Sequence, residues 1–330
     1  MILLGNSCST GHHEEYIYLK GEALGTFYSI TYYCPENKNF HDNIRDLFRQ
    51  MEASMSIYDP GSIITAINKS EAGGETDSLF RTVFRKSVEI SVLTGNAFDI
   101  TVAPLVNAWG FGTTGRRNPG QEGIDSIMQY VGIDKVRLEG EMLVKDDPGV
   151  KLDMNAVAKG YMSDLVADFL ESAGVKDYMV EVGGELRLKG DNPEGNPWRI
   201  GIDKPADDPA PAQRELQEIL HITGRALATS GSYRRFFIEK GKKYSHTINP
   251  FTGYPVDHNL LSVTVVTSTA IEADAWATAF MVLGHEKSLH FAEEMEDIEA
   301  YFIYESSPGK LEVEYTKGFA AWLREESSVE

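Results

Sequence analysis

Asp274 and Thr278 are the two side chains of this sequence whose types and spacing most directly suggest chemistry. They lie four apart in an apolar stretch, residues 272–281, and would share one side of a helix. A carboxylate in so apolar a helix is costly unless it is paired or bound to a metal. Two hard oxygen ligands suit Mg²⁺, which fills its other positions with water and phosphate oxygens. The alternative is structural: Asp274 bonds to an arginine or a backbone amide, and Thr278 bonds back to its own helix.

The helix that must position this pair is predicted from its two ends. Thr269 and Glu272 have the spacing of a capping box, and Gly284 is a typical stop after Leu283. An apolar stripe along the helix is formed by Ala275, Trp276, Ala279, Phe280 and Leu283. We therefore expect a buried helix that follows directly on a strand at residues 260–267.

A second segment combines an acid, a lysine and small residues at the predicted start of a long helix, residues 154–172. The N-terminus of a helix attracts anions, and small residues let a ligand approach the backbone closely. Lys159 is then a candidate contact for a phosphate or for the polar edge of a ring. The structural alternative makes Asp153 an acid that caps the helix and Lys159 a solvated charge.

Hydroxyl groups and one histidine mark two further segments. Residues 229–234 read Thr-Ser-Gly-Ser-Tyr-Arg, which suits a loop around a phosphate or ribose but equally a plain turn. His246 precedes a sharp Asn249-Pro250 turn, and histidine is the usual general base near neutral pH, although a single histidine is more often structural. The sequence lacks a G-x-S-x-G elbow, so a hydrolase triad is unsupported.

One glycine-rich segment is a misleading match to a nucleotide-binding motif. Residues 110–115 satisfy G-x-G-x-x-G, but the Arg-Arg-Asn-Pro-Gly that follows is not the start of a helix. A dinucleotide site of this kind needs a strand before the glycines and a helix after them. We therefore interpret the segment as a surface loop.

Composition narrows the class of protein. The chain has 330 residues, 42% of them hydrophobic, which is enough for a substantial core. Its net charge of −19 argues against nucleic acid as a partner, because no basic excess is available to displace counterions. A phosphate-bearing ligand remains compatible if a divalent cation neutralises it. Cys8 and Cys34 form no C-x-x-C pair, so no zinc or redox motif is indicated.

The pattern of the remaining elements favours an α+β fold, because helices and strands are mixed without strict βαβ alternation. Predicted helices cover residues 44–55, 80–94, 127–131 and 154–172, and predicted strands cover 27–33, 178–182, 185–188, 198–202, 234–238, 243–248 and 260–267. The Pro-rich residues 204–216 are interpreted as a surface insertion. We expect a poorly ordered leader over residues 1–20 and a single domain over residues 21–330.

The first residues resemble the tail of a lipoprotein signal, in which Cys8 would be acylated. Their apolar run is shorter than a working signal sequence requires, so a disordered leader is the alternative. The lipoprotein interpretation predicts a protein outside the cytoplasm, anchored by lipid at the periplasmic face of the inner membrane. No run of 18 apolar residues is present to span a membrane.

Together these segments resemble the motifs of the ApbE family, the FAD:protein FMN transferases. Residues 152–161 are similar to L-D-L-G-G-I-A-K-G-Y, and residues 180–190 to V-N-V-G-G-D-I-R-x-x-G. Residues 228–233, 245–253 and 272–278 resemble A-T-S-G-D-Y, S-H-I-I-D-P-R-T-G and E-A-D-A-W-A-T. Shorter matches at residues 24–26, 56–60 and 97–101 follow the order of the family, and the resemblance runs from about residue 22 to residue 320.

The resemblance implies a two-lobed α+β fold with a flavin bound between the lobes. It implies a transferase that moves the FMN half of FAD to a Thr or Ser hydroxyl of a target protein and releases AMP. Some members hydrolyse FAD to FMN and AMP instead, and a non-catalytic FAD-binding protein is a further alternative. The implied Mg²⁺ ligands are Asp274, Thr278 and the backbone carbonyl of Ala156, and His246 matches the histidine that assists removal of the acceptor's proton.

Further positions match residues that the resemblance places at the bound dinucleotide. They are Leu24, Tyr58, Ala97, Phe98, Asp99, Asp153, Lys159, Ser230, Gly231 and Ile248. The sequence departs from the family pattern at four positions: Leu24 replaces Met, Asn155 replaces Gly, Ser232 replaces Asp, and Asn249 replaces the Asp before Pro. We expect Asn155 to add a side chain beside the metal-binding carbonyl and Asn249 to lower the basicity of His246.

Overall fold

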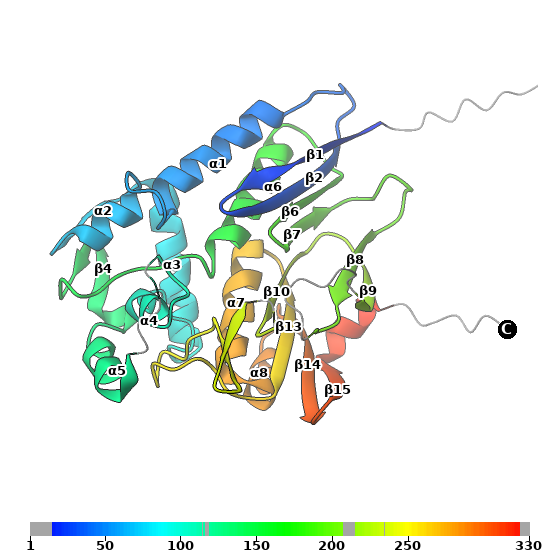
Figure 1. Ribbon diagram of the computed structural model, residues 1–330. Coiled ribbons are helices and arrows are strands. Elements are labelled where there is room, and N and C mark those ends of the chain that lie inside the picture. The colour runs from blue at the N-terminus through cyan, green and yellow to red at the C-terminus, as the bar shows by residue number, and fades with distance from the viewer. Residues whose placement is uncertain (1–14, 114, 116–118, 207–214, 234, 324–330) are drawn as a thin grey trace, which may run out of the picture.

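The computed structural model describes residues 15–113, 115, 119–206, 215–233 and 235–323 (Figure 1). Its centre is an eight-stranded sheet in which every neighbouring pair of strands is antiparallel. In spatial order the strands are β1 (Tyr16–Ala23), β2 (Thr26–Tyr33), β6 (Tyr178–Val182), β7 (Glu185–Lys189), β10 (Ala226–Gly231), β13 (Leu260–Thr267), β14 (Glu299–Ser307) and β15 (Lys310–Tyr315).

Helices cover one face of this sheet. Helix α6 (Ala158–Ser172) packs on β6 and β7, and α7 (Ala270–Leu283) packs on β10 and β13. The largest buried cluster of apolar residues lies between these helices and the sheet, and it extends into α1 (His41–Met55) and α3 (Ser78–Leu93). Helix α8 (His285–Glu294) packs against α7 and β14. The predicted α+β class is confirmed.

The other face of the sheet has its own smaller core. It is covered by the separate pair β8 (Trp198–Asp203) and β9 (Leu216–Ile222) and by the short helix η2 (Lys317–Trp322). Leu186 and Leu188 of β7 face this core, whereas Glu185 and Arg187 alternate onto the helix-covered face, where Glu185 meets α6 and Arg187 meets Asp164. The polar residues of β7 are therefore directed at α6 and α7.

The remaining elements lie beside the central sheet. They are α2 (Ile63–Lys69), β3 (Gly73–Glu75), α4 (Ala103–Ala108), α5 (Gly120–Met128), η1 (Ile133–Lys135), β4 (Val136–Glu139), β5 (Met142–Lys145), β11 (Phe236–Glu239) and β12 (Lys242–Ser245). Figure 1 shows α2 to α5 on one side of the molecule and β8, β9, β14 and β15 on the other, as a two-lobed arrangement requires. Among the described helices, none is long and apolar enough to cross a bilayer.

The poorly ordered leader predicted over residues 1–20 extends too far, because an ordered strand begins at Tyr16. Residues 16–20 belong to β1, an edge strand whose Tyr16 and Leu19 are buried against the sheet. The strand turns into β2 through Leu24 and Gly25, which both have positive φ angles, as a two-residue hairpin turn requires. Residues 1–14, including Cys8, lie outside the described part of the chain.

Two predicted helices are wrong in their bounds. The long helix begins at Ala158 rather than at residue 154, because Val157 has a non-helical φ of −150° and the Gly160 N–H donates to Asp274 rather than to the Ala156 carbonyl. The helix predicted at residues 127–131 lies earlier, as α5, because Ile124 is the residue buried against α4. In both cases packing against a distant segment decided the boundary, which local periodicity does not show.

Candidate active site

The residue predicted to carry the chemistry, Asp274, lies in a buried cluster of charged groups. Its Oδ2 atom is 3.5 Å from the Nζ of Lys159, which lies in the first turn of α6. The same Nζ is 3.0 Å from Oε1 of Glu185 at the start of β7. Asp274 and Glu185 are buried and Lys159 is half-buried. Three segments distant in sequence therefore bring two carboxylates and one ammonium group together.

Gly160 fixes the distance between the two helices. A Cβ atom at this position would lie 2.1 Å from the carbonyl oxygen of Ala270 and 2.9 Å from Cβ of Asp274. The Gly160 N–H donates to Asp274 Oδ2 at 3.1 Å instead of to the carbonyl four residues before it, that of Ala156. The sequence predicted that the N-terminus of α6 attracts an anion, and in the structure the Asp274 carboxylate accepts a backbone N–H there. Among the described residues, the Ala156 carbonyl stays outside the helical hydrogen-bond ladder.

Glu185 is the cluster member that the sequence reasoning missed. Its Oε2 atom is buried and has no hydrogen-bond partner among the described residues. Burial raises the pKa of Glu185, Lys159 opposes that shift, and the nearby Asp274 carboxylate adds to it. Burial alone would lower the pKa of Lys159, but Asp274 and Glu185 raise it above its usual value. Its position as the acidic residue after Val-Gly-Gly was the one available sequence signal.

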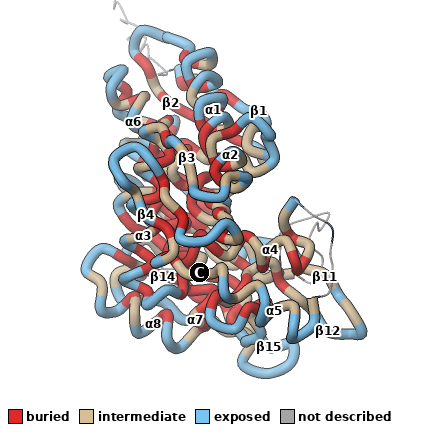
Figure 2. Tube along the Cα trace, turned by 90° about the vertical axis from the view of Figure 1, so that its left-hand side faces the viewer, coloured by how far each residue is buried: buried red, intermediate tan, exposed pale blue. Residues whose placement is uncertain are grey.

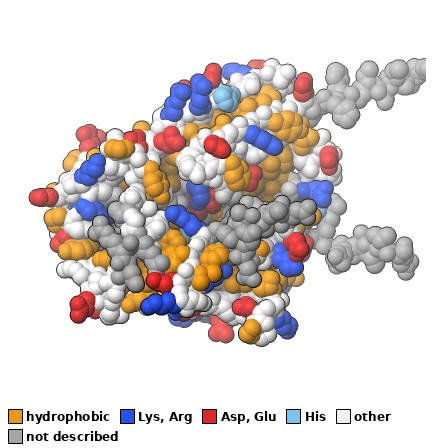
Figure 3. Space-filling view, in the orientation of Figure 1, with side chains coloured by type: hydrophobic (Ala, Val, Ile, Leu, Met, Phe, Trp, Pro, Cys, Tyr) orange, Lys and Arg blue, Asp and Glu red, His pale blue; other side chains and the backbone are white. Residues whose placement is uncertain are grey.

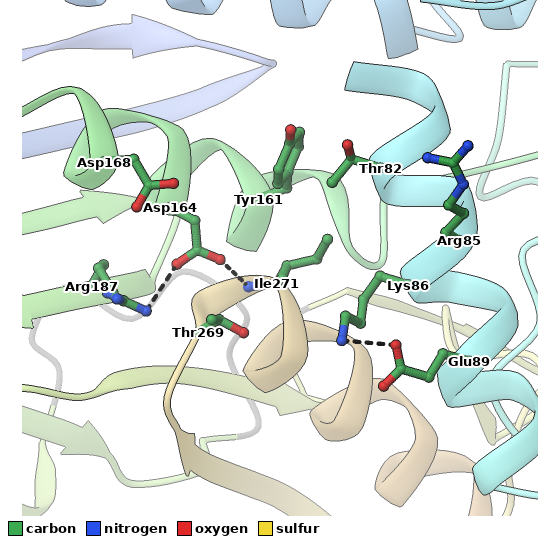
Figure 4. A pocket seen from close by; sticks show the side chains of 10 residues that line it. All are labelled: Thr82, Arg85, Lys86, Glu89, Tyr161, Asp164, Asp168, Arg187, Thr269 and Ile271. Carbon is green, nitrogen blue, oxygen red and sulfur yellow. Dashed lines mark hydrogen bonds and ion pairs between the residues drawn. The ribbon is translucent and has the colours of Figure 1, made fainter. Parts of the chain in front are cut away.

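The start of α7 is held by α6 rather than by its own capping box. The Asp164 carboxylate accepts the N–H groups of Ala270 and Ile271, both at 2.8 Å (Figure 4). Thr269 is the N-cap residue, but its hydroxyl donates to the Glu272 side chain and caps no backbone amide. The predicted capping box is therefore wrong in its contacts. The helix itself runs to Leu283 and stops at Gly284, as predicted.

Asp164 also borders a cavity of about 380 Å³, seen in Figure 4. Arg187 on β7 lies 3.5 Å from Asp164, and its guanidinium also donates to the Ser268 carbonyl. Burial raises the pKa of Asp164 to about 6, although the two backbone amides and Arg187 oppose this shift. None of the lining residues was a predicted site residue. The residues that line the cavity thus include Asp164, which holds the start of α7.

His246 is the residue that directly follows β12. Its Nδ1 atom lies 3.1 Å from the Arg235 carbonyl oxygen, which accepts only if Nδ1 carries the proton. That tautomer leaves the Nε2 lone pair available to accept a proton. Burial lowers the pKa of His246 to about 4, the Arg235 carbonyl opposes this shift, and the positive charges of Arg235 and Lys159 add to it. The imidazole is therefore neutral at pH 7.

Electrostatic coupling links the histidine to the acidic cluster. The charge of Lys159 influences His246, and the charge of Arg235 influences both His246 and Asp153. Burial raises the pKa of Asp153, and its Oδ1 accepts the Asn155 N–H at 2.9 Å. Charges on the segments around residues 153–160 and 235–246 therefore influence one another, and Lys159 links them to Asp274.

The predicted dinucleotide contacts fall into two groups. Tyr58 is 59% exposed, and Leu24 and Ser230 are half-buried, so their side chains are open to a ligand. Asp153 and Lys159 are half-buried as well, and the remaining five are buried: Ala97, Phe98, Asp99, Gly231 and Ile248. Asp99 accepts bonds from the backbone and hydroxyl of Thr101, at 2.7 and 2.6 Å. The side chains of this second group pack against protein.

Two of the unusual residues keep the local geometry. Asn155 is exposed, so its side chain does not fill the buried cluster. The Asn249 side-chain oxygen accepts the N–H groups of Phe251 and Thr252, at 2.8 and 3.2 Å, and so holds the turn after His246. An aspartate at position 249 could accept the same bonds, so the substitution changes the charge and preserves the turn.

Comparison with known proteins identifies the class that this architecture defines. A model of the ApbE family matches residues 24–302, which is most of the chain. The chain therefore belongs to the ApbE family.

Individual relatives agree over nearly the whole length. The FAD:protein FMN transferase of Vibrio cholerae serotype O1 is 39% identical over 289 residues, which cover 84% of this chain and 85% of that protein. The protein of the same name from Escherichia coli K12 is 36% identical over 288 residues, covering 84% and 81%. The structure of the flavin transferase ApbE from Vibrio cholerae superposes with a TM-score of 0.84 at 35% identity, covering 94% of this chain and 99% of that one.

Proposed function

We propose that this protein is a Mg²⁺-dependent transferase that moves the FMN part of FAD onto a Thr or Ser hydroxyl of a target protein and releases AMP. The names of its relatives support the transfer of FMN from FAD to a protein. The observation that carries the proposal here is the buried oxygen-rich cluster around Asp274, which lies in electrostatic reach of a neutral histidine.

The residues of the cluster fit a hard divalent cation. Asp274 is a buried carboxylate, the Ala156 carbonyl is outside the helical ladder, and Thr278 lies one turn after Asp274 on α7. Two buried carboxyl groups face a single lysine, so with both groups ionised the cluster carries an excess negative charge that a cation would neutralise. When bound, Mg²⁺ would supply positive charge against the phosphate oxygens of the dinucleotide.

Side chains of this protein would then accept the proton of the acceptor hydroxyl and hold the charged groups of the site in place. His246 would accept the proton of the acceptor hydroxyl at Nε2, because Nδ1–H is held by the Arg235 carbonyl. The hydroxyl oxygen would form a bond to the phosphorus of the FMN half. The bond from that phosphorus to the bridging oxygen would break, and this oxygen would leave with AMP. The carboxyl groups of Glu185 and Asp274 both contact the Lys159 ammonium group, so they restrict the rotation of its side chain.

Release of AMP from FAD tests the proposal. Wild-type protein with FAD, Mg²⁺ and an acceptor should form AMP, whereas Asp274→Ala should lower the rate by about 10²-fold or more. AMP formed at the same rate without an acceptor would instead identify a FAD pyrophosphatase. If the protein binds FAD but releases no AMP at any Mg²⁺ concentration, it is a non-catalytic flavin-binding protein.

The place of action is a further proposal. A lipid attached to Cys8 would hold the enzyme outside the cytoplasm, at the periplasmic face of the inner membrane. The lipoprotein-like sequence before Cys8 supports this location, and cell fractionation tests it.

A further inference from the structure

The β11–β12 hairpin stands apart from the sheets of the molecule. Among the described strands the two pair only with each other, and a two-stranded pair of this kind has an edge to which a further strand could bind. Figure 2 shows the hairpin beside α4 and α5, with an exposed tip. Its two-residue turn, Lys240-Gly241, has positive φ angles at both positions.

The two faces of the hairpin differ in what they contact. Phe237 and Tyr244 form a cross-strand pair that stacks inward, on Phe111 and on Trp109 respectively. The opposite face carries Ile238, which is 65% exposed, together with Phe236 and Lys243. The hairpin is thus anchored by aromatic rings on one side and presents an apolar, cationic surface on the other.

Positive charge is concentrated on this element of an acidic protein. Within residues 235–243 there are four cations and one acid: Arg235, Lys240, Lys242, Lys243 and Glu239. Lys243 lies over the Phe236 ring at 4.2 Å, and Lys242 pairs with Asp257 at 2.6 Å. The chain as a whole has a net charge of −19, and in the view of Figure 3 acidic and basic side chains are scattered rather than gathered by sign. A basic hairpin in this setting attracts acidic partners selectively.

The hairpin leads directly into the proposed catalytic base. The His246 N–H donates to the Arg235 carbonyl at 3.1 Å, which continues the pairing of β11 and β12 by one residue. A chain that binds along an edge of the hairpin therefore lies next to the imidazole that must meet the acceptor hydroxyl. On the basis of the proposed function, we propose that the β11–β12 hairpin docks the acceptor protein by binding an extended acidic segment of it beside its target Thr or Ser.

The features of the site favour a protein partner over a membrane. A lipid surface would have no use for a strand edge, whereas an extended protein segment pairs with one. The specific consequence is that Lys240 and Lys243 should control the affinity for the acceptor. Because neither lysine lies in the Asp274 cluster, FAD binding should not depend on them.

The test uses the whole chain and two labelled peptides. One peptide has a central Thr flanked by Asp and Val residues, and in the other each Asp is replaced by Lys. Fluorescence anisotropy should show that wild-type protein binds the acidic peptide and not the basic one, and hydrogen exchange should show protection of residues 235–245. The double variant K240E/K243E should bind the acidic peptide at least about ten-fold more weakly. The matched control K176E/K287E, which reverses two exposed lysines on other elements, should bind as wild type does.

Several results would overturn this inference. The inference fails if K240E/K243E binds the acidic peptide as tightly as the wild type does. It fails if the acidic peptide does not bind the wild type or does not protect its hairpin from exchange. It also fails if phosphatidylglycerol vesicles protect the hairpin and the peptide does not. FAD affinity, measured for every variant, separates loss of docking from loss of folding. AMP release by the wild type is scored independently: if FAD is never split, the proposed function fails whatever the peptides do, and if FAD is split but the acidic peptide does not bind, only the docking inference fails.

Discussion

At the scale of single residues, the charge balance around Asp274 is the central feature. Lys159 supplies one positive charge between the carboxyl groups of Glu185 and Asp274, and Oε2 of Glu185 has no hydrogen-bond partner among the described residues. A buried excess charge is costly, so the cluster gains by taking up either a proton or a cation. The raised pKa of Glu185 reflects the first outcome, and we interpret the second as the functional one.

Glu185→Gln tests this interpretation. In protein without Mg²⁺ the variant should be no less stable than the wild type, because it removes the excess buried charge. Its Mg²⁺ affinity should fall by about 10- to 100-fold, because Glu185 neighbours the metal-binding carboxylate. Thermal unfolding over a Mg²⁺ titration measures both effects, with the exposed Glu194→Gln as the control. An unchanged Mg²⁺-dependent rise in Tm would contradict the role assigned to Glu185.

The pH dependence of transfer follows from the lowered pKa of His246. The free imidazole has a pKa near 6.5, but in the folded protein it stays neutral down to about pH 4. The base should therefore be lost only as pH falls through about 4, so kcat/KM should show no decline with its midpoint near 6.5 that is attributable to this histidine. His246→Asn should lower the rate of transfer by about 10²- to 10⁴-fold. A decline centred near pH 6.5 in the wild type that disappears in His246→Asn would refute this assignment.

The same shift makes stability depend on pH. Below about pH 6.5 the unfolded chain binds a proton at His246 that the folded chain does not bind until about pH 4. The contribution of His246 to stability is therefore complete above the unfolded pKa and is lost as pH falls toward the folded one.

Much of the site could be predicted from residue types and spacing. Asp274, Lys159 and His246 were each recognised separately, and the structure pairs Lys159 with Asp274 and places its charge within reach of His246. The contacts of Glu185, Arg235 and Asp164 could not be read from the sequence. Each of these residues acts on an atom more than ten residues away in the chain, and local patterns carry no information on such contacts.

At the scale of elements, α6 and α7 are joined at two points one helical turn apart. Gly160 donates its N–H to Asp274, and Asp164 accepts the first amides of α7. Because both contacts lie on one face of each helix, they fix the rotation of α7 and with it the direction of the Asp274 carboxylate. The cap of this functional helix therefore comes from its neighbour.

Asp164→Ala should loosen that attachment. It leaves the Ala270 and Ile271 amides without their carboxylate, and we expect the free energy of unfolding to fall by about 2 kcal/mol or more. The matched control is Asp168→Ala, one turn further along α6, where an exposed carboxylate lines the same cavity and the change should stay within about 0.5 kcal/mol. Urea unfolding of both variants measures the difference. Equal stability of the two would show that Asp164 does not hold α7.

The sequence predicted only part of the strands: β1, β3, β4, β5, β9, β14 and β15 were not predicted. The strand at residues 260–267 and the hairpins at residues 178–188 and 236–245 followed from alternation and turn residues. The start of α6 did not follow from the sequence, because the Gly160 N–H donates to the distant Asp274 rather than to the Ala156 carbonyl. The edge strand β1 was missed because it follows a stretch without any structural signal.

At the scale of the whole molecule, two cationic features of this acidic chain lie close to the candidate site. Lys159 lies inside the acidic cluster, and the basic hairpin lies beside His246. This distribution suits an enzyme that splits a negatively charged dinucleotide and receives a second protein at the same place. The net charge argued against nucleic acid as a partner and left a phosphate-bearing substrate compatible.

The central claim is transfer of a flavin phosphate to a protein hydroxyl, and the mass of a co-expressed acceptor tests it most directly. With the wild-type enzyme, we predict that the acceptor gains the mass of FMN less one water on a single Thr or Ser, and that Asp274→Ala leaves the acceptor unmodified. Free FMN and AMP in equal amounts, with an acceptor of unchanged mass, would contradict the account and show that the enzyme hydrolyses FAD.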